Sequence, residues 1–172
     1  MAPVTDEQRR IQSYLQAQGA KLSPADIIGK VRIAMEEVRE ALFSVNVERF
    51  NNRPDGDEWS ANEVMAHVVG AGAHFGNSII RVLDGAVSGP PVADRIEGGA
   101  PARSPAAWWD LLVRDREALF TRVLSADPHA HLDRAITHPM FGPLTWREAL
   151  LFVRLHDLDH AGQLRKIAEH LA

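Results

Sequence analysis

Cysteine is absent from this chain of 172 residues. Disulfide bonds and thiolate metal sites are therefore excluded, so a bound metal ion would have to be held by histidine, aspartate or glutamate. The chain also lacks an apolar run approaching the roughly 20 residues that cross a bilayer, and no cluster of lysine and arginine stands out against its formal charge of −4. We therefore expect neither a membrane span nor a nucleic-acid partner.

The N-terminal segment, residues 1–10, is polar and lacks the apolar stretch of a signal peptide. Together with the missing cysteines, which fit a reducing compartment, this indicates a soluble, cytoplasmic protein. A glycine-rich phosphate loop and the Gly-x-Ser-x-Gly motif of serine hydrolases are missing too, so neither chemistry is expected. The length suits a single domain with a substantial core.

Helical periodicity dominates the rest of the sequence. Residues 5–18 predict a short amphipathic helix within an N-terminal extension, residues 1–22. Four longer helices are expected in a domain of residues 23–172, each opening at a residue that favours the N-cap position: Ser23, Ser60, Ser104 and Thr145. Two of these residues are followed by proline at the first helical position, and two by glutamate three residues later, which completes a capping box.

No segment shows convincing alternation of apolar and polar residues, so no strand is predicted. The connections over residues 85–103 and 128–144 are expected to be long loops. Four helices with two long connections indicate an all-α fold, a four-helix bundle with an additional short N-terminal helix. The long connections also argue against a bundle wound simply up-down-up-down.

The most informative segment contains two histidines four residues apart, His156 and His160, in the last predicted helix. This spacing places both imidazoles on one face, about one turn apart, where they can share a metal ion. Apolar flanks such as Phe152 and Leu164 indicate that this face points toward the core. Polar groups there cost free energy unless they are satisfied, and a metal ion would satisfy them.

His67 is the strongest candidate for a third ligand, because it falls on the apolar stripe of the second bundle helix. The alternative is a core histidine bonded to a backbone carbonyl or a hydroxyl. Three imidazoles would leave coordination positions open, as in catalytic metal sites, and would suit Zn²⁺ or Ni²⁺ better than Fe²⁺ or Mn²⁺. Gln163 and His74 are candidates for orienting a ligand or contacting substrate. Their alternatives are a polar residue at the core edge and a partly buried histidine, respectively.

The remaining histidines and the nearby aspartates are assigned no role in the site. Helical geometry is expected to turn Asp157 and Asp159 away from the ligand face, toward solvent or a salt bridge. Four histidines in predicted loops or at the C-terminus are expected on the surface: His129, His131, His138 and His170. The histidine pair also differs from the zinc-protease helix motif, which requires glutamate directly after the first histidine.

Three stretches of the sequence together resemble the DinB-like superfamily. They are Trp59-Ser60-x-x-Glu63-Val64-x-x-His67, Phe141-Gly142-Pro143-Leu144-Thr145-Trp146-x-Glu148 and His156-x-x-x-His160-x-x-Gln163-Leu164. Each motif is weak by itself, and it is their order and combination that carry the similarity. The superfamily includes YfiT-type bacillithiol transferases and mycothiol-dependent maleylpyruvate isomerases.

The resemblance implies a four-helix bundle of up-down-down-up topology. It also implies a divalent metal ion held by three histidines, which correspond here to His67, His156 and His160. Members with known chemistry use a low-molecular-weight thiol as cofactor, and homodimers are frequent in the superfamily. Residues 1–22 and the 85–103 connection depart from the compact family pattern.

The sequence leaves three functional interpretations open. The first is an enzyme that transfers a low-molecular-weight thiol to a small electrophile, for which the cysteine-free chain needs an external thiol. The second is a metal-dependent hydrolase that activates water, for which His74 could serve as base. The third is a non-catalytic helical stress or interaction protein whose metal only stabilises the fold. Both enzyme interpretations require a small-molecule substrate and an open metal position.

Overall fold

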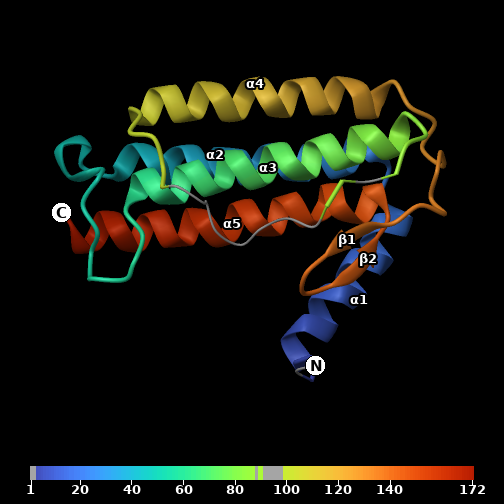
Figure 1. Cartoon of the computed structure of the whole chain (residues 1–172), viewed down its shortest axis with the longest axis horizontal. Helices are drawn as coiled ribbons and strands as arrows, with labels where there is room; N and C mark the ends of the chain where they lie inside the picture. The colour runs from blue at the N-terminus through green and yellow to red at the C-terminus, as the bar shows by residue number, and fades with distance from the viewer. Residues whose placement is uncertain (1–2, 88, 91–98) are drawn as a thin grey trace.

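The structure is a computed structural model that describes residues 3–87, 89–90 and 99–172. Its elements follow one another along the chain as α1 (Asp6–Lys21), α2 (Pro24–Ser44), the 3-10 turn η1 (Val47–Arg49), α3 (Ala61–Leu83), α4 (Pro105–Leu124), β1 (Ile136–His138), β2 (Gly142–Leu144) and α5 (Trp146–His170). Four of the helices, α2 to α5, lie side by side in a bundle (Figure 1). In that view α3 and α4 run in one direction while α2 and α5 run in the opposite one, which is the up-down-down-up arrangement that the family resemblance implies.

Local sequence determines where the bundle helices begin. The hydroxyls of Ser60 and Thr145 accept hydrogen bonds from the backbone N–H groups of Glu63 and Glu148, whose carboxylates accept bonds from the capping residues in return. The other two bundle helices begin after a capping serine followed by proline, at Ser23-Pro24 and Ser104-Pro105. All four predicted starts are therefore confirmed. Although α3 is 23 residues long, no helix in the described ranges is both long and apolar enough to cross a membrane.

The N-terminal helix α1 packs against α5, with contacts at Glu148 and Arg154, and its own first turns project beyond the bundle (Figure 1). Leu15 is fully buried in this contact. Gly19 permits a close approach, because a Cβ atom there would lie 2.9 Å from Cγ of Glu148. The helix predicted over residues 5–18 is confirmed and extends three residues further. The proposed boundary at residue 22 between an extension and a bundle domain stays a prediction.

A short antiparallel hairpin, β1–β2, lies where residues 128–144 were expected to form only a loop. Ile136 pairs with Leu144 and His138 with Gly142. Each strand has three residues, too few for alternation to stand out in the sequence, although the buried-exposed-buried pattern of β1 is present. Gly142 adopts φ +69°, a left-handed conformation that favours glycine at the turn. Of the other predicted loop, 85–103, residue 88 and residues 91–98 lie outside the described ranges.

The core consists of two apolar clusters with a buried ion pair between them. One cluster, toward the hairpin, includes Phe75 and Leu119, and the other includes Val68 and Leu112. Between the clusters, the guanidinium of Arg116 on α4 donates hydrogen bonds of 2.6 and 2.9 Å to the two carboxylate oxygens of Asp157 on α5. Both side chains are almost completely buried.

The buried ion pair agrees with the expectation for Asp157, which gave solvent or a salt bridge as its surroundings. The salt bridge is present, and it lies inside the protein. Gly72 on α3 leaves room for the guanidinium, because a Cβ atom at this position would lie only 3.0 Å from Nη2 of Arg116. The sequence alone does not predict the pair, since its partners are 41 residues apart on different helices.

Candidate metal centre

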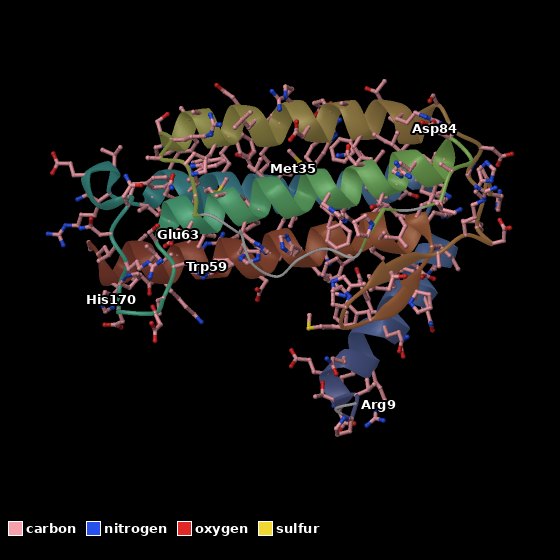
Figure 2. All side chains as sticks on the ribbon, in the orientation of Figure 1. Arg9, Met35, Trp59, Glu63, Asp84 and His170 are labelled. Carbon is pink, nitrogen blue, oxygen red and sulfur yellow. The ribbon has the colours of Figure 1, made fainter. Side chains whose placement is uncertain are left out.

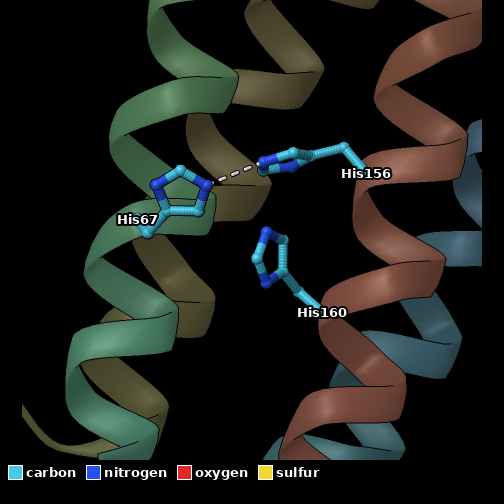
Figure 3. A group of neighbouring side chains, drawn as sticks. All are labelled: His67, His156 and His160. Carbon is cyan, nitrogen blue, oxygen red and sulfur yellow. Dashed lines mark hydrogen bonds between the residues drawn. The ribbon is translucent and has the colours of Figure 1, made fainter. Parts of the chain in front are cut away.

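Three histidines from two helices point toward one another between α3 and α5 (Figure 3). His67 projects from α3, and His156 and His160 project from α5. One ring nitrogen of each lies within 4.8 Å of the other two, and the Nε2 atoms of His67 and His156 are 3.0 Å apart. The structure thus brings together the three residues that the sequence predicts as metal ligands.

The donor set fits a divalent ion. Imidazole nitrogens that share an ion at about 2.1 Å lie at most about 4.2 Å apart. The three histidines, called the trio below, therefore need only a small side-chain rotation to bring their nitrogens within this distance. The short contact between His67 and His156 requires that at most one of the two Nε2 atoms carries a proton. Three neutral imidazoles complete neither a tetrahedral nor an octahedral shell, which leaves room for a further ligand.

The surroundings keep His156 in the neutral form that binds metal ions. The pKa of this imidazole falls from 6.5 to about 2, chiefly because of burial and also because positive charge on His160, His67 or Arg116 would repel a proton here. His156 is half-buried and keeps some contact with solvent, because it lines a cavity. The apolar walls of that cavity and the nearby guanidinium of Arg116 nevertheless make protonation costly.

We expect the metal-free protein to lose stability as the pH falls below the ordinary histidine pKa of 6.5. In the unfolded chain His156 takes up a proton near that pH, whereas in the folded chain it stays neutral until about pH 2. The unfolded state therefore binds more protons, and the free energy of unfolding falls by up to about 1.4 kcal/mol per pH unit. Urea unfolding at pH 7 and pH 5 of the wild type and of His156→Gln measures the effect. Equal pH dependence in both proteins would refute it.

Gln163 lies one turn beyond His160 and contacts it directly. Its Oε1 atom accepts a hydrogen bond of 2.9 Å from Nδ1–H of His160, so the lone pair of that ring resides on Nε2. On the other side of the trio, the indole ring of Trp59 lies 5.1 Å from the ring of His67. Trp59 is labelled in Figure 2. The sequence indicated Trp59 as part of the family motif and as the apolar residue that precedes the capping Ser60.

Replacing Gln163 by leucine is expected to weaken the affinity for Zn²⁺ by about 10- to 100-fold, the usual effect of removing a group that orients a metal-binding histidine. The reason is that the ring of His160 loses the acceptor that fixes its tautomer. Competition titration with a chromophoric chelator measures the change. Gln163→Glu, which keeps an acceptor oxygen, is the matched control and should bind nearly as tightly as the wild type. Wild-type affinity in Gln163→Leu would contradict the assigned contact.

His74, the other predicted supporting residue, lies apart from the trio. Its Nε2 atom is 2.6 Å from the carbonyl oxygen of Pro90, to which it donates a hydrogen bond. The residues that line the cavity beside the trio do not include it in the described part of the chain. A contact between His74 and substrate therefore stays a prediction.

A cavity of about 430 Å³ opens beside the trio, within the size range of small-molecule sites. All three histidines line it. The remaining walls come from α1, from α3, from the hairpin and its turn, and from α5, and most of the side chains on them are apolar: Ile11, Phe75, Pro139, Met140, Phe141, Phe152 and Leu155. The trio is thus reachable by a small molecule.

His138 belongs to this cavity and not to the surface, which corrects the sequence expectation. Its exposed fraction is 7%, and its Nδ1 atom accepts hydrogen bonds from the backbone N–H groups of Met140 and Phe141. The imidazole stacks on the ring of Phe75 at a centroid distance of 5.8 Å. The error follows from the unpredicted hairpin, which turns β1 inward. Of the other three histidines expected on the surface, two are exposed and one is half-buried: His129, His170 and His131.

Asp159 also lies closer to the site than the sequence indicated. It is exposed, yet it is one of the residues that line the cavity, together with His156 and His160. The expectation that it turns away from the ligand face was wrong, because residues three apart on a helix are neighbours on its surface. The site therefore has one carboxylate at its rim.

Fold and geometry together define a four-helix bundle with a three-histidine site, on two of its helices, that could hold a metal ion. The chain belongs to the DinB superfamily, whose family model matches residues 30–164. The crystal structure of TT2238, described as a four-helix bundle protein, is similar over 84% of this chain and 99% of that one, with a TM-score of 0.62 and 18% identity. At this identity the likeness concerns the fold alone. No curated protein matches the chain.

Proposed function

We propose that the protein is a divalent-metal-dependent enzyme that transfers a low-molecular-weight thiol to a small electrophile. The observation that carries the proposal is the position of His67, His156 and His160 on the wall of a cavity of small-molecule size. Membership of the DinB superfamily supports it, since members with known chemistry use such thiols. The absence of cysteine means that the sulfur must come from outside the chain.

Each part of the site has a distinct task in this proposal. The three imidazoles would hold the ion, which when bound lowers the pKa of a thiol and so favours the nucleophilic thiolate. Gln163 keeps His160 in the tautomer that presents Nε2. The apolar cavity walls exclude water and hold the electrophile beside the trio. In the net reaction a sulfur–carbon bond forms, the thiol proton is released to solvent, and the displaced electron pair leaves with the leaving group.

The test is a transfer assay with Zn²⁺- or Ni²⁺-loaded protein. Cysteine, glutathione, bacillithiol and mycothiol are each offered with 1-chloro-2,4-dinitrobenzene, from which thiol displaces chloride. At least one thiol should react faster with the loaded wild type than with the metal-free protein, and His160→Ala should abolish the difference. The proposal fails if no thiol is accelerated although the metal is bound.

A metal-dependent hydrolase is the second candidate, and Asp159 is the observation that favours it. A carboxylate at the rim of the cavity supplies the general base that such an enzyme needs. Hydrolysis of 4-nitrophenyl acetate without any thiol, lost in Asp159→Asn, would favour this candidate over thiol transfer. The cavity that reaches the trio argues against a purely structural metal, which is normally sealed from substrate. A homodimer, as the family resemblance implies, stays a prediction.

A further inference from the structure

We propose that the cavity beside the trio selects an uncharged, planar electrophile, either an aromatic or a conjugated molecule. That the ligand is an electrophile rests on the proposed function. The preference for an uncharged, planar molecule depends only on the cavity walls. Two features of these walls carry it. The first is a continuous aromatic surface, and the second is the kind of charge at the rim.

The aromatic surface is built around Phe152 on α5. Its ring centroid lies 5.4 Å from that of Phe75 and 5.5 Å from that of Phe141. The ring of His138 joins the group at 4.5 Å from Phe152 and 4.8 Å from Phe141. Each of these four rings contacts at least two of the others, and all four residues line the cavity. A flat π-system gains both burial and stacking energy on such a surface, whereas a bulky aliphatic group gains burial alone.

The charge at the rim disfavours an anion. In the described part of the chain, the lining contains the carboxylate of Asp159 and no lysine or arginine. Two arginines occur nearby on the helices, but each is directed to another group. Arg116 donates to both oxygens of Asp157, and Arg154 donates to the hydroxyl of Tyr14. A carboxylate ligand would therefore leave water for apolar walls without a protein cation to compensate, and only a bound metal ion would offset that cost.

The lining of the cavity has a polar part and an apolar part, which orients the ligand. The trio and Asp159 supply polar groups, whereas Ile11 of α1 and Met140 of the hairpin turn supply apolar ones. A molecule with one polar electrophilic group and one ring would place the group beside the trio and the ring on the aromatic surface. Ile11 lies outside residues 30–164, which match the family model, so its contribution to the wall comes from outside the family domain.

A matched pair of ligands tests the preference without any thiol or turnover. Benzylideneacetone is an uncharged conjugated ketone, and cinnamate has the same ring and double bond with a carboxylate in place of the acetyl group. Calorimetric titration of the full-length protein, metal-free and Zn²⁺-loaded, gives both dissociation constants. We expect the ketone to bind at least tenfold more tightly than cinnamate to the metal-free protein, and this preference to narrow in the loaded protein because the ion attracts a carboxylate. Equal or tighter binding of cinnamate to the metal-free protein would overturn the proposal.

Variants locate the preference in the named walls. Phe141→Leu keeps the apolar volume but removes a ring, and should weaken ketone binding at least fivefold with unchanged metal content. Phe43→Ala, at a half-exposed phenylalanine of α2 away from the cavity, is the control and should change nothing. Asp159→Asn should admit cinnamate at least threefold more tightly. Unchanged constants in both cavity variants would refute the assignment, whereas a failed transfer assay with these preferences intact would refute only the proposed function.

Discussion

Replacing Asp157 by alanine is expected to lower the free energy of unfolding by about 3–5 kcal/mol, the largest effect on stability that the structure predicts. The substitution leaves the guanidinium of Arg116 buried between the two apolar clusters with no anionic partner. An uncompensated charge at that depth is far more costly than the pair itself is favourable. Urea unfolding of the metal-free variant, followed by circular dichroism, measures the loss.

The exposed pair of Arg39 and Glu36 on α2 provides the matched control, since about half of each side chain is in solvent. Glu36→Ala should cost less than about 1 kcal/mol. Replacing both partners of the buried pair, as Arg116→Met with Asp157→Leu, should recover most of the stability that Asp157→Ala loses. If Asp157→Ala costs no more than Glu36→Ala, the buried pair does not have the importance assigned to it.

Replacing His160 by alanine is expected to weaken the affinity for Zn²⁺ or Ni²⁺ by at least about 100-fold, beyond the 10- to 100-fold usual for supporting residues. The variant removes one of three converging nitrogens and also leaves Gln163 without its partner. Competition titration with a chromophoric chelator measures the affinity. His129→Ala removes a histidine whose side chain is 81% exposed and should bind the metal like the wild type. Equal affinity in both variants would exclude His160 from the site.

The bundle could be predicted from the sequence because its helices are specified locally. The four helix starts were predicted from a capping serine or threonine, followed at a fixed distance by proline or glutamate. Helical periodicity predicted which faces of the helices point to the core. The hairpin was missed because its strands are too short for periodicity. The order of the helices in space came from the family resemblance rather than from the residues.

The candidate site was predictable to the extent that its residues share a helix face. His156 and His160 are one turn apart, and His67 lies on an apolar stripe, so local geometry pointed all three inward. His138 could not be assigned, because its position depends on a tertiary turn of the chain. The pairing of Arg116 with Asp157 was equally hidden, since nothing local to either residue indicates the other.

X-ray absorption at the metal edge of the Zn²⁺-loaded protein tests the central claim most directly. Our account predicts one ion per chain with three imidazole nitrogens at about 2.0–2.1 Å, and the loss of one of them in His160→Ala. A spectrum with fewer than three imidazoles in the wild type, or one that His160→Ala leaves unchanged, would contradict the account.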